Sequence, residues 1–269
     1  MKYYIPNYHD TSVSKMSLLA PIGYPTHIVR ADPLLNWAVL SEDKGNMIIA
    51  GNCGSGVQST CDQMLLSILR LYSPDELSIG LINCGEHFND TLFDELPNVD
   101  TLNINSSQTC KFFCHKVNDE IQHRHEFLRD HDYHLQEGNF ILYVVNYFDE
   151  MLEFIKTDHA RSVLLHNLEM GPEVGVYTIF VSDHKVDYSK ISDITDHFKH
   201  RLVCRSDKYT SIELLGSDVA SLIEEPAGHA VYSGNCGIDP YDVTHMLIPY
   251  ADENTKKEVI RKLLLKHRR

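Results

Sequence analysis

A glycine-rich stretch between an apolar strand and an apolar helix constrains this chain more than any other part of it. The apolar run Met47–Ala50 leads into Gly51, four residues follow, and Gly56 comes directly before a helical pattern. This order of strand, G-x-x-x-x-G and helix is that of the Walker A phosphate-binding loop. The motif continues with a lysine for the phosphates and a Ser or Thr for Mg²⁺, whereas this chain has Val57 and Gln58. The outline of the loop is therefore present without the two side chains that carry its chemistry.

Strands and helices alternate along the rest of the chain. Short apolar runs predict the strands, and helical periodicity predicts the helices. The predicted strands are 47–50, 77–83, 99–104, 139–145, 175–181 and 201–204, and the predicted helices are 58–71, 108–131, 161–170, 215–225 and 255–267, with a helix or loop at 187–198. The segment 139–145 is almost continuously apolar, which is typical of a strand buried on both faces of a parallel sheet. The alternation predicts an α/β fold with a mainly parallel central sheet and helices on both faces.

The chain is expected to form one domain over residues 1–269. It is long enough to bury a large core, and no internal repeat, low-complexity tract or Pro/Gly/Ser-rich linker divides it. We expect an N-terminal segment of short edge strands (1–45), a core (46–250) and a closing helix (251–269). The segments 228–232 and 242–248 are predicted to pair as antiparallel strands.

The formal net charge of −14 argues against non-specific nucleic-acid binding through the overall field of the protein. Basic residues do gather near the C-terminus, at Lys256, Lys257, Lys262 and Lys266. We interpret them as part of a helix whose last turns suit cations, and a local basic patch is the alternative. No run reaches the roughly 18 apolar residues that span a bilayer. We therefore expect no direct membrane insertion by this segment, which leaves open that it is a fragment of a membrane protein.

The seven cysteines are odd in number and include no C-x-x-C pair, which indicates reduced thiols rather than a disulfide framework. Cys110 and Cys114 lie four residues apart on a predicted helix. Together with His115 they suggest the alternative of a zinc site, but structural burial is favoured. The nearby histidines do not share one helical face at ligand spacing, and no metal site is predicted.

The second group of charges that a phosphate-loop hydrolase needs is also missing. Such enzymes carry a Walker B Asp for Mg²⁺ at the end of a buried strand, with a Glu beside it that prepares the attacking water. The buried strand here ends in Asn146 and Tyr147. Asn brings no charge to the metal, and Tyr is no useful base near neutral pH. No catalytic residue is therefore assigned. Two pairs of neighbours remain as substitutes: Ser59 or Thr60 for Gln58, and Asp149 or Glu150 for Asn146.

Nucleotide binding without turnover is a separate question. Backbone N–H groups of a glycine-rich loop at a helix N-terminus favour anions, but Val57 places an apolar side chain where the phosphates would meet a cation. We expect weak or absent binding, and therefore no cofactor. The residues of this vestigial loop are Gly51, Gly54, Ser55, Gly56, Val57, Gln58 and Ser59.

Further segments follow the motifs of one family in the same order along the chain. They are LSIL at 66–69, SPDELSIGLI at 73–82, FDELPNV at 93–99, EIQHRHEFL at 120–128, RLVCR at 201–205, DKYTSIELLG at 207–216 and GHAVY at 228–232. With the loop, they resemble the FtsK/SpoIIIE family of P-loop ATPase domains from about Leu18 to the C-terminus. The resemblance implies a RecA-like P-loop NTPase fold, whose active members use ATP and Mg²⁺. It also implies that Arg124 occupies a motif position.

The opening LLAPIG at 18–23 is most similar to the tandem ATPase modules of EssC/EccC-type coupling proteins of type VII secretion. The resemblance implies a degenerate C-terminal, third module in the cytoplasmic part of a bacterial protein anchored in the cell membrane. It implies small helical WXG-type secretion substrates and neighbouring ATPase modules as partners, and no nucleic acid is expected.

We therefore expect a pseudo-ATPase module that recognises substrates, regulates adjacent ATPase modules, or does both. One alternative is an active or nucleotide-binding ATPase of the same family with displaced catalytic residues. The second is a DNA translocase module, which the acidic balance argues against.

Overall fold

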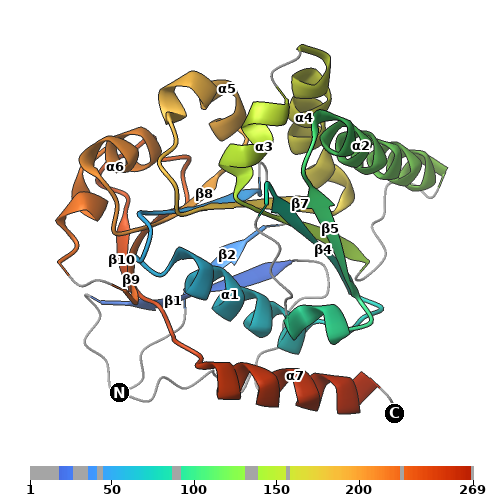
Figure 1. Cartoon of the computed structure of the whole chain (residues 1–269), viewed down its shortest axis with the longest axis horizontal. Helices are drawn as coiled ribbons and strands as arrows, with labels where there is room; N and C mark the ends of the chain where they lie inside the picture. Colours follow the sequence, from blue (N-terminus) through green and yellow to red (C-terminus); the bar gives the residue numbers. More distant parts are fainter. Residues whose placement is uncertain are drawn as a thin grey trace.

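A single sheet runs through the centre of the molecule (Figure 1). The computed structural model describes residues 18–26, 36–40, 45–86, 92–130, 139–155, 158–224 and 227–267. Within these ranges the strands are β1 (Leu19–Pro25), β2 (Asn36–Val39), β3 (Met47–Ala50), β4 (Leu77–Cys84), β5 (Val99–Ile104), β6 (Phe140–Asn146), β7 (Val176–Ser182), β8 (His200–Cys204), β9 (His229–Ser233) and β10 (Thr244–Leu247). Their order across the sheet is β2-β1-β10-β9-β8-β3-β7-β6-β4-β5.

The helices connect and cover these strands. The α-helices are α1 (Val57–Leu71), α2 (Ser107–Asp130), α3 (Phe148–Phe154), α4 (Asp158–Met170), α5 (Ser192–Thr195), α6 (Lys208–Leu215) and α7 (Glu253–His267). Short 3₁₀ helices are η2 (Leu92–Glu95), η3 (Gly171–Val174), η4 (Tyr188–Ile191) and η5 (Val219–Leu222). None of the helices in the described ranges combines the length and the apolar character that crossing a membrane requires.

The parallel strands bring their carboxyl ends to one edge of the sheet. Strands β8, β3, β7, β6, β4 and β5 are parallel neighbours in that order, and the remaining pairs are antiparallel. The last residue of β3, Ala50, lies opposite Ser182 of β7. The last residue of β6, Asn146, lies opposite Asn83 of β4. Segments that follow β3, β4, β6 and β7 therefore meet at this edge, although they are far apart in the sequence.

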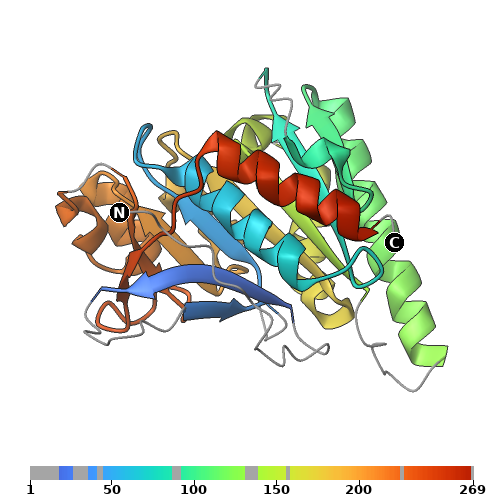
Figure 2. The same cartoon turned by 90° about the horizontal axis from the view of Figure 1, so that it is seen from below.

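Two apolar cores lie on the two faces of the sheet. Helices α1 and α7 cover one face, and α2 to α6 lie on the other (Figures 1 and 2). Alternate residues of the strands divide between the cores: Met47 and Ile49 pack on the α1 side, and Ile48 and Ala50 pack on the other. All four residues of β3 are buried, because a central parallel strand is covered on both faces. This double burial holds the glycine loop after β3 in a fixed position.

The sequence predicted the fold class correctly: the fold is α/β, with a mainly parallel sheet and short antiparallel strands at one edge. The helix predicted over 215–225 is wrong. Helix α6 ends at Leu215 instead, because Gly216 takes a left-handed conformation with φ of 69°, and only η5 follows. The start of α6 is fixed by Asp207, whose carboxylate accepts hydrogen bonds from the N–H groups of Tyr209 and Thr210.

Candidate functional site

The loop after β3 has the shape that its glycines predict. Gly56 precedes α1 with φ of 93°, a conformation that favours glycine. Gly51 has no room for a side chain, because a Cβ there would lie 2.5 Å from Ser55 Oγ and 2.9 Å from Cys204 Cβ. The N–H of Ser55 donates to Asn52 O at 3.0 Å and closes the turn. The structure thus forms the compact strand-to-helix turn on which a phosphate loop is built.

The side chains that follow this turn do not supply the chemistry of the motif. Val57 is 1% exposed and packs in the core beneath the loop, with Cγ2 2.9 Å from where a Cβ of Gly51 would lie. Gln58 is half-buried, and its Nε2 has no hydrogen-bond partner among the described residues. The site therefore has an apolar group at the lysine position and an amide at the hydroxyl position.

The two hydroxyl substitutes for Gln58 differ in their surroundings. The hydroxyl of Thr60 donates to Gly56 O at 2.9 Å and lies 3.7 Å from Cys204 Sγ, so it is held by its own helix. Ser59 is exposed. Burial raises the pKa of the Cys204 thiol to about 11, against the lowering effect of Thr60. The thiol beneath the loop is therefore protonated at neutral pH and is no nucleophile.

Asn146 pairs with a second amide at the end of β4. Its Nδ2 donates to Asn83 Oδ1 at 3.1 Å. Asn83 is 3% exposed, and its own Nδ2 and Asn146 Oδ1 are buried without hydrogen-bond partners in the described part of the chain. A neutral amide pair thus occupies the edge position where a Walker B motif has its metal-binding Asp. Together with Val57, this pair does not fit a magnesium–nucleotide complex, whose charge requires cations and carboxylates.

Tyr147 turns the chain sharply into α3. It adopts a left-handed conformation with φ of 54° and ψ of 48°, which is uncommon for a residue with a side chain. Its ring lies 5.5 Å from that of His184, measured between centroids. The turn places the substitute acids Asp149 and Glu150 in the first turn of α3. Tyr147 is therefore a packing and turning residue in this structure.

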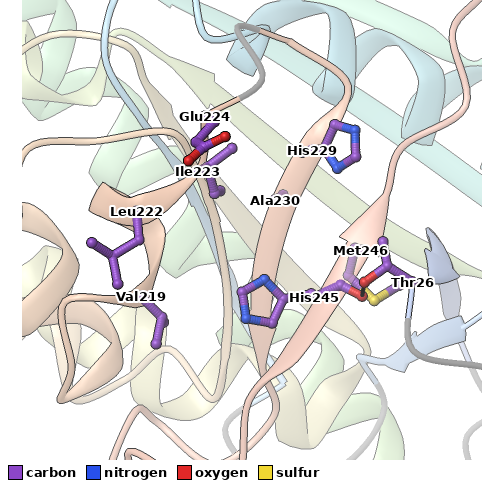
Figure 3. Close-up of a pocket in the computed structure, with 9 residues that line it drawn as sticks. All are labelled: Thr26, Val219, Leu222, Ile223, Glu224, His229, Ala230, His245 and Met246. Carbon is purple, nitrogen blue, oxygen red and sulfur yellow. Dashed lines mark hydrogen bonds between the residues drawn. The ribbon is translucent and has the colours of Figure 1, made fainter.

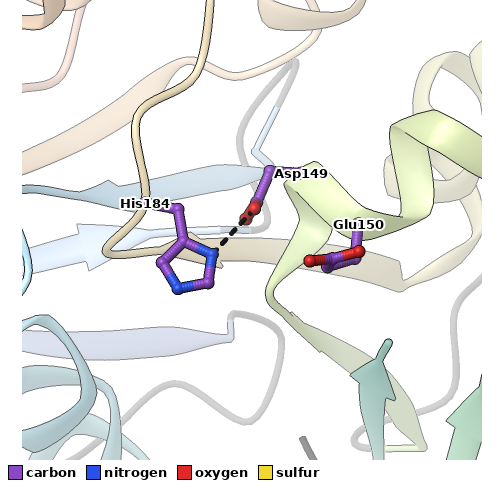
Figure 4. A group of neighbouring side chains, drawn as sticks. All are labelled: Asp149, Glu150 and His184. Atoms are coloured by element: carbon purple, nitrogen blue, oxygen red, sulfur yellow. Dashed lines mark hydrogen bonds and ion pairs between the residues drawn. The ribbon is translucent and has the colours of Figure 1, made fainter. Parts of the chain in front are cut away.

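Asp149 is bonded to the end of β7, the strand between β3 and β6. Its Oδ1 accepts a hydrogen bond from Ser182 Oγ at 2.5 Å, and its Oδ2 lies 3.0 Å from His184 Nδ1 (Figure 4). Glu150 lies beside Gly85, where a Cβ would be 3.1 Å from Glu150 Cγ. Sequence reasoning named the two acids as substitutes but missed Ser182 and His184. Only the order of the strands brings these two residues to α3.

A groove on another part of the surface is built from η5, β9 and β10 (Figure 3). It has a volume of about 360 Å³. Its apolar lining comes from Val219, Leu222, Ile223, Ala230 and Met246, and its polar lining from Thr26, Glu224, His229 and His245. Leu222 is 68% exposed, so the groove presents an apolar side chain to solvent.

Two other sequence predictions concern residues away from the edge formed by the carboxyl ends of the parallel strands. Cys110 and Cys114 are buried and His115 is exposed, as the structural interpretation of the cysteines expects.

Arg124 pairs with Glu120 at 2.7 Å and donates to Asn139 O at 2.7 Å and to Val174 O at 3.2 Å. It thereby ties α2 to the amino ends of β6 and β7, at the opposite edge from the loop.

Comparisons with known proteins agree with this architecture. A model of the FtsK/SpoIIIE family matches residues 8–179. No curated protein matches the chain. Among solved structures, the cytoplasmic domain of the type VII secretion ATPase EccC from Thermomonospora curvata has a TM-score of 0.74 and 18% identity, over 94% of this chain and 32% of that chain. EssC (ATPases 2 and 3) from Geobacillus thermodenitrificans has a TM-score of 0.74 and 18% identity, over 99% of this chain and 52% of that chain.

A third similar structure contains a bound peptide. It is Thermomonospora curvata EccC (ATPases 2 and 3) in complex with a signal sequence peptide, with a TM-score of 0.67 and 14% identity, over 95% of this chain and 48% of that chain. The present chain thus spans 32% to 52% of the length of these three structures. At these identities the likeness shows a shared RecA-like fold.

Proposed function

The chain belongs to the FtsK/SpoIIIE family, and from this premise we propose that it is a non-catalytic module of a type VII secretion coupling protein. Its role there is to recognise substrates, to regulate neighbouring ATPase modules, or both. One observation supports the non-catalytic role: neither the Walker A lysine position nor the Walker B Asp position carries a charge. Val57 is buried under the loop, and Asn146 is paired with Asn83. Phosphoryl transfer is accelerated almost entirely by positioning and positioned charge.

The type VII setting is supported by the likeness to EccC and EssC modules. In this setting the chain is a cytoplasmic module of a protein anchored in the bacterial membrane. Its partners are the neighbouring ATPase modules and small helical substrates of the WXG type. The signal sequence peptide bound to the related EccC structure supports a substrate-recognition role.

The groove between η5 and the β9–β10 pair is the candidate acceptor for such a substrate. Its volume of about 360 Å³ is near the lower end of the range for small-ligand sites. It therefore fits one or two anchoring side chains of an amphipathic helix rather than a whole helix. Leu222 and Ile223 would contact the apolar anchors, and Glu224, His229 and His245 would contact polar groups beside them.

The non-catalytic role is tested by phosphate release from ATP. The purified chain is compared with its Glu150→Gln variant and with an active module of the family. We expect the wild type to release no more phosphate than Glu150→Gln, because neither Val57 nor Asn146 supplies charge. Turnover that Glu150→Gln abolishes would instead identify the displaced-residue ATPase.

The receptor role is tested by calorimetry with helical WXG-type substrates. We expect Leu222→Ala to weaken binding about 10-fold, as for an anchor contact at an interface. The matched control is Leu265→Ala on α7, which is 55% exposed and lies away from the groove. No binding by the wild type contradicts the receptor role, and equal loss in both variants contradicts the groove as its site.

A further inference from the structure

Three side chains of metal-binding types gather where α3 meets the end of β7. One ligand atom each from Asp149, Glu150 and His184 lies within 4.8 Å of the others (Figure 4). Among the described residues, no other group of three His, Cys, Asp or Glu side chains is so close. The three residues come from two segments that are 34 positions apart in the sequence, and Tyr147 and the strand order bring them together.

The spacing within the cluster suits a shared ion. The ligands of a tetrahedral zinc ion lie about 2.0–2.1 Å from the metal and hence about 3.4 Å from one another. Asp149 Oδ2 and His184 Nδ1 are already 3.0 Å apart. A metal replacing the proton between these atoms requires them to separate slightly, and Glu150 supplies the third ligand by a small side-chain movement.

A carboxylate lies near the second ring nitrogen of His184, and a small movement would let it accept a hydrogen bond from that nitrogen. Metal-bound histidines usually donate their second ring N–H to a carboxylate, which orients the ring. The Oδ1 atom of Asp183 lies 3.8 Å from His184 Nε2, and it is buried without a hydrogen-bond partner among the described residues. The hydroxyl of Ser182 donates a hydrogen bond to Asp149 Oδ1 and so orients this carboxylate.

The charges of the cluster also favour a cation. Asp149, Glu150 and Asp183 are half-buried and face a single imidazole. In the described ranges, no Lys or Arg forms an ion pair with any of these three carboxylates. Carboxylates that are partly removed from water are stabilised by a nearby positive charge. A bound divalent ion would provide that charge.

We propose that Asp149, Glu150 and His184 bind one divalent transition-metal ion without a nucleotide, and that Asp183 orients His184. One imidazole nitrogen and two carboxylates suit zinc-type ions better than magnesium, which prefers an all-oxygen shell. The site differs from a nucleotide–metal site because none of its ligands comes from the glycine loop. Titration with zinc in the absence of nucleotide therefore tests this site separately from ATP binding.

The test is calorimetric titration of the full chain with zinc alone, and then with magnesium. We expect one zinc ion per chain at this site, with at least 10-fold weaker binding in His184→Gln and in Glu150→Gln. Asp183→Asn should weaken zinc binding about 10-fold, as for other second-layer partners of metal-bound histidines. His123→Gln, which removes an exposed histidine on α2, is the matched control and should bind like the wild type.

The His123→Gln control is needed because exposed histidines elsewhere on the surface can also bind zinc. Zinc binding that is equal in the wild type, His184→Gln and Glu150→Gln would overturn the proposal, as would a wild type without stoichiometric zinc binding. Urea denaturation of each variant without metal checks that it folds. A rise in the wild-type unfolding midpoint on adding zinc, absent in folded Glu150→Gln, is the second expected result.

Discussion

At the scale of single residues, two glycines of the loop are required for different reasons. Gly54 has φ of 78°, but a Cβ there would meet nothing within 4 Å. Gly51 lacks space instead, because Ser55, Val57 and Cys204 surround it. Val57 fills the volume under Gly51, so the residue that replaces the motif lysine has become part of the packing that shapes the turn.

This difference predicts unequal costs for two alanine substitutions. Gly54→Ala should lower the free energy of unfolding by about 1 kcal/mol, because only the left-handed backbone is strained. Gly51→Ala should lower it by about 2–3 kcal/mol, because the new methyl group collides with packed atoms. Urea denaturation of both variants measures the two costs. Equal costs, or a larger cost at Gly54, would show that packing under the loop is loose.

At the scale of elements, α7 is attached to α1 by one ion pair within an apolar contact. Lys256 Nζ lies 2.6 Å from Asp62 Oδ2 and 2.9 Å from Glu253 Oε1, while Ile260 and Leu263 are buried in the core shared with α1. Burial raises the pKa of Asp62 against the lowering effect of Lys256. The desolvation of Asp62 therefore offsets much of what the ion pair contributes.

We expect the two halves of this ion pair to be strongly coupled. Asp62→Leu should cost about 1–2 kcal/mol, because it leaves Lys256, which is 13% exposed, with Glu253 as its remaining acid. Adding Lys256→Met should recover most of that loss, since an apolar pair of similar size can replace a partly buried ion pair, in which Lys256 is 13% and Asp62 32% exposed. A double-mutant cycle from urea denaturation measures the coupling. Additive losses would mean that the apolar contact alone attaches α7.

The elements also differ in how clearly the sequence predicts them. The strands at 47–50, 77–84 and 140–146 were predicted to within a residue, because most of their residues are apolar and most are buried. Helix α3 was missed, because it has only seven residues and follows Tyr147, whose left-handed conformation no glycine signals. The true position of α6 was signalled by the Asp207 cap and Gly216, which outweigh the apolar pattern beyond Leu215.

At the scale of the whole molecule, the arrangement of the strands determines what the sequence can and cannot reveal about the site. The loop and Asn146 belong to motifs whose residues are close together in the sequence, so the sequence alone predicts them. His184 and Ser182 carry no local signal, and they reach Asp149 because β7 inserts between β3 and β6. A constellation made by strand order cannot be derived from residue spacing.

The distribution of charge over the molecule supports the prediction that it does not bind DNA. The net charge is −14, and the basic residues of α7 are partly neutralised by acids. Lys256 pairs with Asp62 and Glu253, and Lys262 lies 2.6 Å from Glu258. The described part of the basic segment is thus a helix with internal ion pairs, which weakens the interpretation as a DNA-binding patch.

We therefore expect no saturable binding of duplex DNA in fluorescence anisotropy at low salt, up to concentrations of about 10 μM. Non-specific DNA-binding proteins have dissociation constants of about 10⁻⁴–10⁻⁶ M at physiological salt, and these become tighter as salt falls. Glu258→Lys is the informative variant, because it removes the partner of Lys262 and raises the net charge of α7 by two. If the balance of charges on α7 is what prevents DNA binding, this variant should bind duplex DNA weakly at low salt. That affinity should disappear as the salt concentration increases. Wild-type binding whose log association constant falls linearly with the logarithm of salt concentration would restore the translocase alternative, because release of counterions from DNA produces that slope.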